Sequence, residues 1–368
     1  MSTTTATHSN SRLFQPLAAG PLSLGNRVAM APMTRSRAPG AVPNALMRDY
    51  YRQRAGAGLV ITEGVATGPE ALGYARIPGI FNEAQRAGWA PVAEAVHGRG
   101  GKLVLQLMHV GRVAHPDNLP AGAVAIAPSA IAAAGQIWTD TQGMQDMPTP
   151  KAMDAADLLR VRDEFASAAS LAVAAGADGV ELHAANGYLL AQFLNPKSNQ
   201  RDDQYGGSAG NRRRFVLEVV DATIAAIGRE RVGVRLSPFN TYNDLAANFD
   251  GEQAELLALV AELSRRRIGY LHLIATPGVV PEETVDAVRA RFDGVLVLAG
   301  DFDRERADAA LAAGGADVIA FGRPFIANPD LPRRLAERLP LASFDPAVMF
   351  SGLAEGYADY PDYQAEAA

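Results

Sequence analysis

The stretch Gly179-Val-Glu-Leu-His-Ala-Ala-Asn-Gly-Tyr188 joins a short apolar run to a group of hydrogen-bonding side chains. Its first four residues are typical of a strand that is buried on both faces. His183 and Asn186 follow the strand, and Tyr188 comes two residues later. An imidazole and a carboxamide can both donate hydrogen bonds to a carbonyl oxygen, and a phenol can then deliver a proton. We therefore expect catalytic residues at the end of this strand.

Similar short runs, rich in Val, Ile and Leu, recur along the whole chain and predict a set of buried strands. The eight runs are Val28–Met30, Leu59–Ile61, Leu103–Leu105, Val180–Leu182, Val232–Leu236, Tyr270–Ile274, Val295–Leu298 and Val318–Phe321. Helical patterns lie between most of them, at 154–175, 211–227, 252–267, 282–292 and 304–313. This alternation predicts an α/β fold, a closed (β/α)8 TIM barrel, with a doubly wound open sheet as the alternative.

We expect one domain over residues 1–368, because no linker or low-complexity stretch divides the chain. Residues 1–12 are expected to be flexible, and Leu13–Asn26 carries turn signals typical of a small cap over the barrel bottom. The longest gap between runs, 113–153, follows the third strand and contains several Pro and Gly residues. It predicts a lid-like insertion between strand 3 and helix 3, over the barrel mouth.

Composition excludes several classes of function. The chain has no cysteine, which rules out disulfides, thiolate catalysis and cysteine-ligated metals, and its histidines show no metal-ligand spacing. A net charge of −6 argues against nucleic acid or an anionic membrane as a partner. The chain has no apolar run of about 20 residues, and Met1–Asn10 lacks the features of a signal peptide. We expect a cytoplasmic protein.

The active site of such a barrel lies at the C-terminal ends of the strands. Gly300 and Gly322-Arg323 follow the last two strands, where backbone N–H groups and a guanidinium can hold a phosphate. Gln106 and Arg235 would lie deeper, where an amide and a cation suit a flat heterocycle with carbonyl and ring-nitrogen edges. A phosphate pocket beside a polar platform of this size predicts FMN as the cofactor.

Longer blocks of the sequence resemble the old yellow enzyme family of FMN-dependent ene-reductases, in its classical branch. The blocks begin at Arg27, Gln106, His183, Asn199, Phe321 and Glu355: RVAMAPMTRSR, QLMHVGR, HAANGYLLAQFL, NQRDDQYGG, FGRPFIANPD and EGYADYP. The resemblance runs from about Leu13 to Tyr363, nearly the whole chain. It is specific because all the blocks occur in the family's order and spacing.

The resemblance implies a role for each matching residue. The residues expected to hold FMN, without a covalent bond, are Pro32, Met33, Thr34, Gly64, Gln106, Arg235, Ala299, Gly300, Phe321, Gly322 and Arg323. His183 and Asn186 would bind the substrate oxygen. Hydride would pass from NADPH, or NADH, to flavin N5 and then to the substrate Cβ, and Tyr188 would protonate Cα. The implied substrates are enones, enals and maleimides, with nitrate esters or nitroaromatics as the alternative. The chain is expected to act as a monomer or a homodimer.

Two positions depart from the family pattern. Met108 stands where members often carry a Trp, and Phe350 stands where many carry a Tyr. With Tyr74, these residues are expected to line the substrate pocket and to change its shape. Two other readings stay open: a flavin-free aldolase or isomerase, for which Glu63 is the one acidic candidate, and a flavin-binding scaffold without turnover.

Overall fold

A closed ring of eight parallel strands forms the centre of the molecule in the computed structural model, which describes residues 11–18, 22–352 and 354–364. The strands are β1 (Val28–Met30), β2 (Leu59–Ala66), β3 (Lys102–Met108), β8 (Gly179–Ala184), β9 (Val232–Leu236), β10 (Tyr270–Ile274), β11 (Val295–Ala299) and β12 (Val318–Phe321). β1 pairs with both β2 and β12, so the ring has no open edge. The predicted (β/α)8 barrel is confirmed, and the open sheet is excluded.

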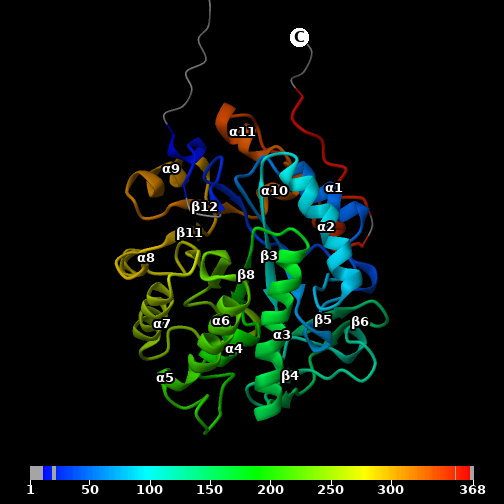
Figure 1. Cartoon of the computed structure of the whole chain (residues 1–368), viewed down its shortest axis with the longest axis vertical. Coiled ribbons are helices and arrows are strands. Elements are labelled where there is room, and N and C mark those ends of the chain that lie inside the picture. The colour runs from blue at the N-terminus through cyan, green and yellow to red at the C-terminus, as the bar shows by residue number, and fades with distance from the viewer. Residues whose placement is uncertain (1–10, 19–21, 353, 365–368) are drawn as a thin grey trace, which may run out of the picture.

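Helices surround this ring, and Figure 1 shows most of them on the outside of the strands. They are α1 (Ala45–Gln53), α2 (Glu83–His97), α3 (Ala155–Ala174), α4 (Leu189–Leu194), α5 (Ala209–Arg212), α6 (Arg214–Ile227), α7 (Glu252–Arg266), α8 (Glu282–Arg289), α9 (Arg304–Ala312), α10 (Pro324–Ala327) and α11 (Leu331–Glu337). Short 3-10 turns lie at Arg12–Phe14, Pro39–Ala41, Pro69–Ala71, Pro116–Asn118, Arg229–Arg231, Tyr242–Asp244 and Pro346–Val348. No helix in these described ranges combines the length and apolar character needed to cross a lipid bilayer.

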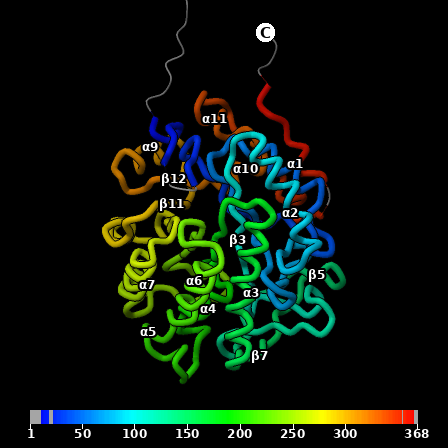
Figure 2. The backbone as a smooth tube through the Cα atoms, in the orientation of Figure 1, coloured from blue at the N-terminus to red at the C-terminus, as the bar shows by residue number. Residues whose placement is uncertain are grey.

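The longest helix, α3, shows how the sequence sets its own boundary. Asp154 accepts a hydrogen bond from the Asp157 backbone, and the Asp157 side chain accepts one from the Asp154 backbone, which is a capping box. The apolar stripe of α3 is buried, and the helix packs beside α6, as the tube in Figure 2 shows. The helical pattern over 154–175 is therefore confirmed, and Asp154 is the N-cap of the helix.

The N-terminal segment closes the bottom of the barrel. Leu17 and Leu24 form an antiparallel bridge, and Leu22 and Leu24 pack against side chains from the beginnings of several barrel strands, including Leu59. Of the start expected to be flexible, residues 1–10 lie outside the described part. Arg12 is held in place, because its guanidinium donates to the Leu311 carbonyl at 3.1 Å.

The 113–153 insertion contains two small sheets. β4 (Ile126–Ala127) pairs with β7 (Lys151–Ala152), and β5 (Gln136–Thr139) forms a hairpin with β6 (Gly143–Asp146). Figure 1 shows this hairpin at the lower right, at the end of the molecule opposite the two termini. The insertion therefore contains a hairpin, and its action as a lid stays a prediction.

The C-terminal segment returns to the barrel mouth and is tied there by buried arginines. Arg35 donates to the Gly356 carbonyl at 2.6 Å, and Arg37 donates to the Val348 carbonyl at 2.7 Å. The ring of Tyr357 stacks on that of Tyr50 with centroids 4.0 Å apart. The described part of 350–368 has neither helix nor strand, and these contacts give it a fixed course along the mouth.

Candidate active site

Two cavities adjoin at the C-terminal ends of the barrel strands. The first has a volume of about 730 Å³ and the second about 690 Å³. Met33 lines the first cavity and Thr34 the second. Likewise, Pro346 lines the first cavity and its neighbour Ala347 the second. Because consecutive residues line different cavities, these are two compartments of one mouth. Each is large enough for a small-molecule ligand or a cofactor.

The first cavity gathers the residues predicted to hold FMN at its phosphate end. Its lining includes Pro32, Met33, Arg235, Ala299, Gly300, Phe321, Gly322 and Arg323. Gly300 has a φ of +136°, and a Cβ there would lie 2.5 Å from the Ala275 carbonyl oxygen, so only glycine fits. The Arg323 side chain is 69% exposed and donates to Asp301 at 2.7 Å. An exposed guanidinium beside close-approach glycines fits a phosphate group.

The predicted ring end of this site comprises Arg235, which lines the first cavity, and Gln106, which lines neither cavity. Both side chains are buried, and the Arg235 Nε has no hydrogen-bond partner among the described residues. A buried donor without a partner is costly and is commonly explained by a ligand or a water. The arrangement fits the carbonyl edge of a flavin ring, as the sequence predicted.

Met108 packs against Gly64. This contact places Met108 differently from the pocket-lining position that the sequence predicts. A Cβ at Gly64 would lie 2.6 Å from the Met108 sulfur, so the glycine makes room for that side chain. Met108 is 1% exposed and lines neither cavity. The sequence placed Met108 on the substrate pocket wall; the structure places it behind that wall, where its shape acts through its neighbours.

The second cavity is lined by the predicted proton donor and by two of the residues expected on the substrate pocket wall, whereas the predicted oxygen-binding residues His183 and Asn186 line neither cavity. Thr34, Tyr74, Tyr188 and Phe350 all line the second cavity. The Tyr188 hydroxyl donates to the Tyr74 hydroxyl at 3.1 Å. The His183 ring lies edge-on to the Tyr188 ring with centroids 4.8 Å apart. The predicted acid therefore lies beside one of the predicted oxygen-binding residues.

Asn186 occupies a strained turn that is held by the next barrel loop. Asn186 has φ +53° and Gly187 has φ +76°, both left-handed. The Asn186 N–H donates to the Ser237 hydroxyl at 2.7 Å, and the Asn243 amide donates to the Asn186 carbonyl at 2.6 Å. The Asn186 Oδ1 is buried without a partner among the described residues. A strained residue with an unpartnered polar side chain is typical of a functional site.

Electrostatics keep the two ring side chains of this site neutral. Burial, with a smaller contribution from the Arg235 charge, lowers the pKa of His183 to about 3. Burial also raises the pKa of Tyr188 above its ordinary value. At neutral pH the imidazole is therefore a neutral donor, and the phenol retains its proton and can act as an acid.

This neutrality predicts substrate binding that does not vary between pH 5 and pH 8. A His183 titrating near its ordinary pKa of about 6.5 would be protonated as pH falls, and the stronger cationic donor would then tighten binding. With the pKa lowered to about 3, that gain lies outside the range. The dissociation constant of 2-cyclohexenone from the oxidised enzyme, measured by absorbance at several pH values, checks this. A midpoint near 6.5 would contradict the neutral assignment.

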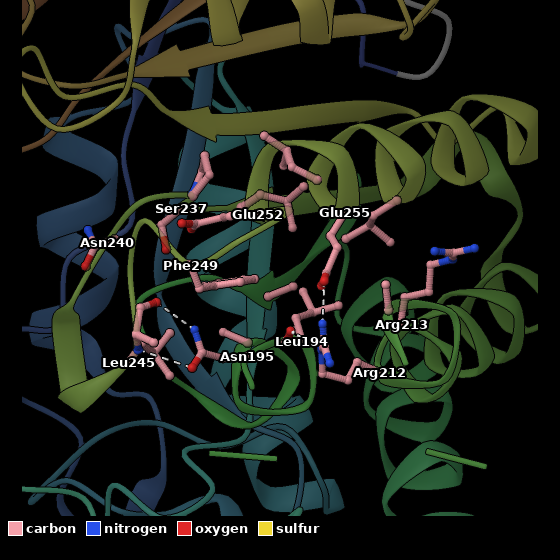
Figure 3. Close-up of a pocket in the computed structure, with 18 residues that line it drawn as sticks. Leu194, Asn195, Arg212, Arg213, Ser237, Asn240, Leu245, Phe249, Glu252 and Glu255 are labelled. Atoms are coloured by element: carbon pink, nitrogen blue, oxygen red, sulfur yellow. Dashed lines mark hydrogen bonds and ion pairs between the residues drawn. The ribbon is translucent and has the colours of Figure 1, made fainter. Parts of the chain in front are cut away.

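A third, smaller cavity of about 90 Å³ lies outside the barrel, between α4, α5 and α7. Figure 3 shows Arg212 directed at Glu255, with which it forms an ion pair, and the Asn195 amide bonded to the chain beside Leu245. None of the predicted site residues lines this cavity. Its nearest connection to the mouth is Ser237, which accepts from the Asn186 backbone. The cavity is therefore space behind the site rather than part of it.

Several residues of the mouth were not predicted from the sequence. They include Asn243 on the loop after β9, Trp138 and Arg76 in the second cavity, and Leu341–Phe344 in the first. The Trp138 side chain reaches the cavity from the β5–β6 hairpin. The proline and aromatic residues of these loops can be seen in the sequence. The sequence does not show that the loops return to the barrel mouth, because that depends on tertiary contacts.

The competing barrel chemistries find no support here. Glu63 accepts from the Arg35 backbone and the Tyr51 hydroxyl, each at 3.2 Å, and lines neither cavity. The described linings of the two cavities contain no lysine that could form a Schiff base. Nor do the described residues contain a cluster of three His, Asp or Glu side chains that could hold a metal ion.

Comparisons with known proteins agree with this geometry. Residues 12–342 match the NADH:flavin oxidoreductase / NADH oxidase family. A morphinone reductase structure superimposes with a TM-score of 0.92 at 45% identity, covering 97% of this chain and 98% of that one. An old yellow enzyme homologue from Zymomonas mobilis gives a TM-score of 0.90 at 38% identity, covering 95% and 99%.

Curated relatives give the same assignment. A probable flavin mononucleotide-dependent alkene reductase of Leishmania infantum is 40% identical over 95% of this chain and 97% of its own length. A putative 12-oxophytodienoate reductase 2 of Oryza sativa subsp. japonica is 39% identical over 95% and 93%. This chain belongs to the old yellow enzyme family and is an FMN-dependent NAD(P)H oxidoreductase of that kind.

Proposed function

We propose that the protein reduces the activated C=C bond of α,β-unsaturated carbonyl compounds, with NADPH or NADH as the hydride donor. The observation that carries this proposal is the grouping of neutral His183, Asn186 and Tyr188 at the end of β8. Overall, NAD(P)H supplies a hydride and the solvent a proton, and the C=C bond becomes a CH–CH bond. The nicotinamide leaves oxidised.

The first cavity would hold FMN, with its phosphate against Gly300, Gly322 and Arg323. Gln106 and Arg235 would face the pyrimidine edge of the ring, and Thr34 with Gly64 would contact its other edge. When bound, FMN takes a hydride from NAD(P)H and gives one to the substrate carbon β to the carbonyl. The side chains of the second cavity then have only to bind the substrate, orient it and move a proton.

His183 and Asn186 would donate hydrogen bonds to the substrate carbonyl oxygen, where negative charge develops as Cβ receives the hydride. Such preorganised donors act strongly because they need no reorientation during the reaction. The Tyr188 hydroxyl would deliver its proton to Cα and recover one through the Tyr74 hydroxyl, 3.1 Å away. Since both half-reactions would use the same mouth in turn, ping-pong kinetics are expected.

An anaerobic absorbance experiment tests the proposal directly. The purified protein should show flavin bands that bleach on addition of NADPH and return on addition of 2-cyclohexenone; a parallel titration with NADH compares the two nucleotides. Bands that bleach but return only with a nitro compound or a nitrate ester would assign the alternative activity. A protein that oxidises no NAD(P)H would be a flavin-binding scaffold, and one that binds no FMN would refute the proposal.

Arg323→Ala is expected to weaken FMN binding about tenfold. A charge-assisted hydrogen bond to phosphate contributes roughly 1.5–3 kcal/mol, and the lower end applies because the Arg323 side chain is 69% exposed and already pairs with Asp301. FMN released on dilution of the holoenzyme, followed by fluorescence, measures the effect. Arg338→Ala is the matched control, because Arg338 is similarly exposed and pairs with Glu305 outside the cavity. Equal FMN release from the two variants would remove Arg323 from the phosphate site.

A further inference from the structure

Glu181 is a fully buried carboxylate in the barrel interior, and it is the register partner of Gln106, a residue of the proposed cofactor site. It lies two residues before His183 on β8, so both side chains point to the same side of the strand. Its exposed fraction is zero, and no step proposed above uses it. A buried charge costs several kcal/mol unless it is paired and hydrogen-bonded, so its contacts need an account.

Three side chains, one from the adjacent strand β3 and two from β10, converge on this carboxylate. The Gln106 amide donates to Oε1 at 2.8 Å, the Tyr270 hydroxyl donates to Oε2 at 3.0 Å, and the His272 Nδ1 lies 2.8 Å from the same oxygen. Tyr270 reaches Glu181 across β9 because residue 233 is a glycine, and a Cβ there would collide with the Tyr270 ring. The network is therefore built into the strand register.

The contact with Gln106 fixes which end of that amide faces the cofactor. A carboxylate only accepts hydrogen bonds, so the Gln106 nitrogen must face Glu181. The amide oxygen is then left to accept from a ring N–H, and one N–H is left to donate to a ring carbonyl. Without the carboxylate, the amide could rotate and present the wrong pair of atoms.

Glu181 also opposes the charge of Arg235. Burial lowers the pKa of Arg235, and the carboxylate is the first of the groups that raise it again. Although burial raises the pKa of Glu181, its contacts with His272 and Gln106 and the charge of Arg235 lower that pKa below its ordinary value, so the carboxylate stays ionised. His183, Arg235 and His272 are register partners on β8, β9 and β10, two residues closer to the C-terminal ends of the strands than Glu181 and its register partners. The charge of Arg235 is therefore close to one buried negative charge.

We propose that Glu181 is a positioning residue of the FMN site, which orients Gln106 and offsets Arg235 and so sets the reduction potential of the bound cofactor. The inference rests on the FMN site proposed above. Reduced FMN carries more negative charge at its pyrimidine edge than oxidised FMN does. A nearby carboxylate therefore disfavours the reduced form, and removing that charge should raise the potential.

The primary test is the midpoint potential of the Glu181→Gln holoenzyme. We expect the equilibrium to shift at least about tenfold toward reduced FMN, which is roughly +30 mV for a two-electron couple. Tyr270→Phe is the matched control, because it removes one donor to Glu181 and leaves the carboxylate charged; its potential should stay near that of the wild type. An unchanged or lowered potential in Glu181→Gln would overturn the proposal.

A second variant keeps the proposal testable if Glu181→Gln does not fold. Glu181→Asp retains the charge but draws the carboxylate back by one methylene, so FMN should leave the diluted holoenzyme about tenfold faster while its potential changes little. In a Gln106→Leu background the same change should add nothing, because the effect acts through Gln106. Additive effects would mean general damage to the core and would refute the positioning role.

These outcomes separate this inference from the proposed function. Wild-type protein without flavin bands would refute the FMN site itself. Wild-type protein with flavin bands, together with Glu181 variants that match it in potential and in FMN release, would refute only the role of Glu181.

Discussion

Tyr188→Phe is expected to slow the reoxidation of the reduced enzyme by 2-cyclohexenone about 10²- to 10⁴-fold, the usual contribution of a positioned general acid. The rate of flavin reduction by NADPH should stay near that of the wild type, because that half-reaction needs no proton from the phenol. Stopped-flow absorbance measures the two half-reactions separately. The change removes only a hydroxyl and keeps the ring that packs beside His183, so the fold should be retained.

Two controls make this result specific to proton transfer. Tyr74→Phe removes the partner of the Tyr188 hydroxyl but leaves the acid in place, so its effect should be below about tenfold. A nitro acceptor, whose reduction needs no proton at carbon, should be reduced by Tyr188→Phe at nearly the wild-type rate. If the enone half-reaction of Tyr188→Phe were unchanged, the proton would come from another group, and the acid assignment would be wrong.

The barrel could be predicted because its strands are buried on both faces. Runs such as Val232–Leu236 and Tyr270–Ile274 have nearly continuous apolar sequences, and the observed strands have the same bounds. The helices α1 and α2 were not predicted, and α2 contains Gly88 and Pro91, which weaken a helical pattern. Local sequence therefore specified the ring of strands better than the layer around it.

The candidate site could be predicted only as far as local sequence reaches. The His183–Tyr188 group lies on one strand end, so its members had to be neighbours. Asn243 holds Asn186 from 57 residues away, and no local pattern shows that contact. Met108 was misplaced for a similar reason: the empty space beside Gly64 that accepts its side chain exists only after β2 and β3 pair.

Glu181 is a second residue whose contacts cannot be predicted from the local sequence. An acid within an apolar strand is visible in the sequence, and it signals that some partner must exist. Its partners come from β3 and β10. Tyr270 can reach the carboxylate only because residue 233 is a glycine. The cost of a buried charge can thus be foreseen from the sequence, whereas the groups that compensate it are set by the strand register.

Removal of both predicted oxygen-binding side chains, His183→Ala with Asn186→Ala, is expected to abolish measurable binding of phenol and to slow enone reduction strongly. A single donor to a developing oxyanion contributes about 10²–10³ in rate. The double variant should lose less than the product of the single effects, because both groups act on one oxygen. Phenol binding is followed by the long-wavelength charge-transfer band, and the rate by stopped flow.

Isosteric variants separate hydrogen bonding from packing in this prediction. Asn186→Asp keeps the shape but replaces a donor by an anion that repels the developing charge, so it should be more damaging than Asn186→Ala. His183→Gln retains a neutral donor and should recover part of the activity lost in His183→Ala, as expected if the imidazole acts without its positive charge. Asn243→Ala loosens the Asn186 turn while leaving its amide present, and should give an intermediate loss. Phenol binding that survives in the double variant would place the substrate oxygen elsewhere in the mouth, and Thr34, Tyr74 and Arg76 are among the polar side chains of the second cavity to examine next.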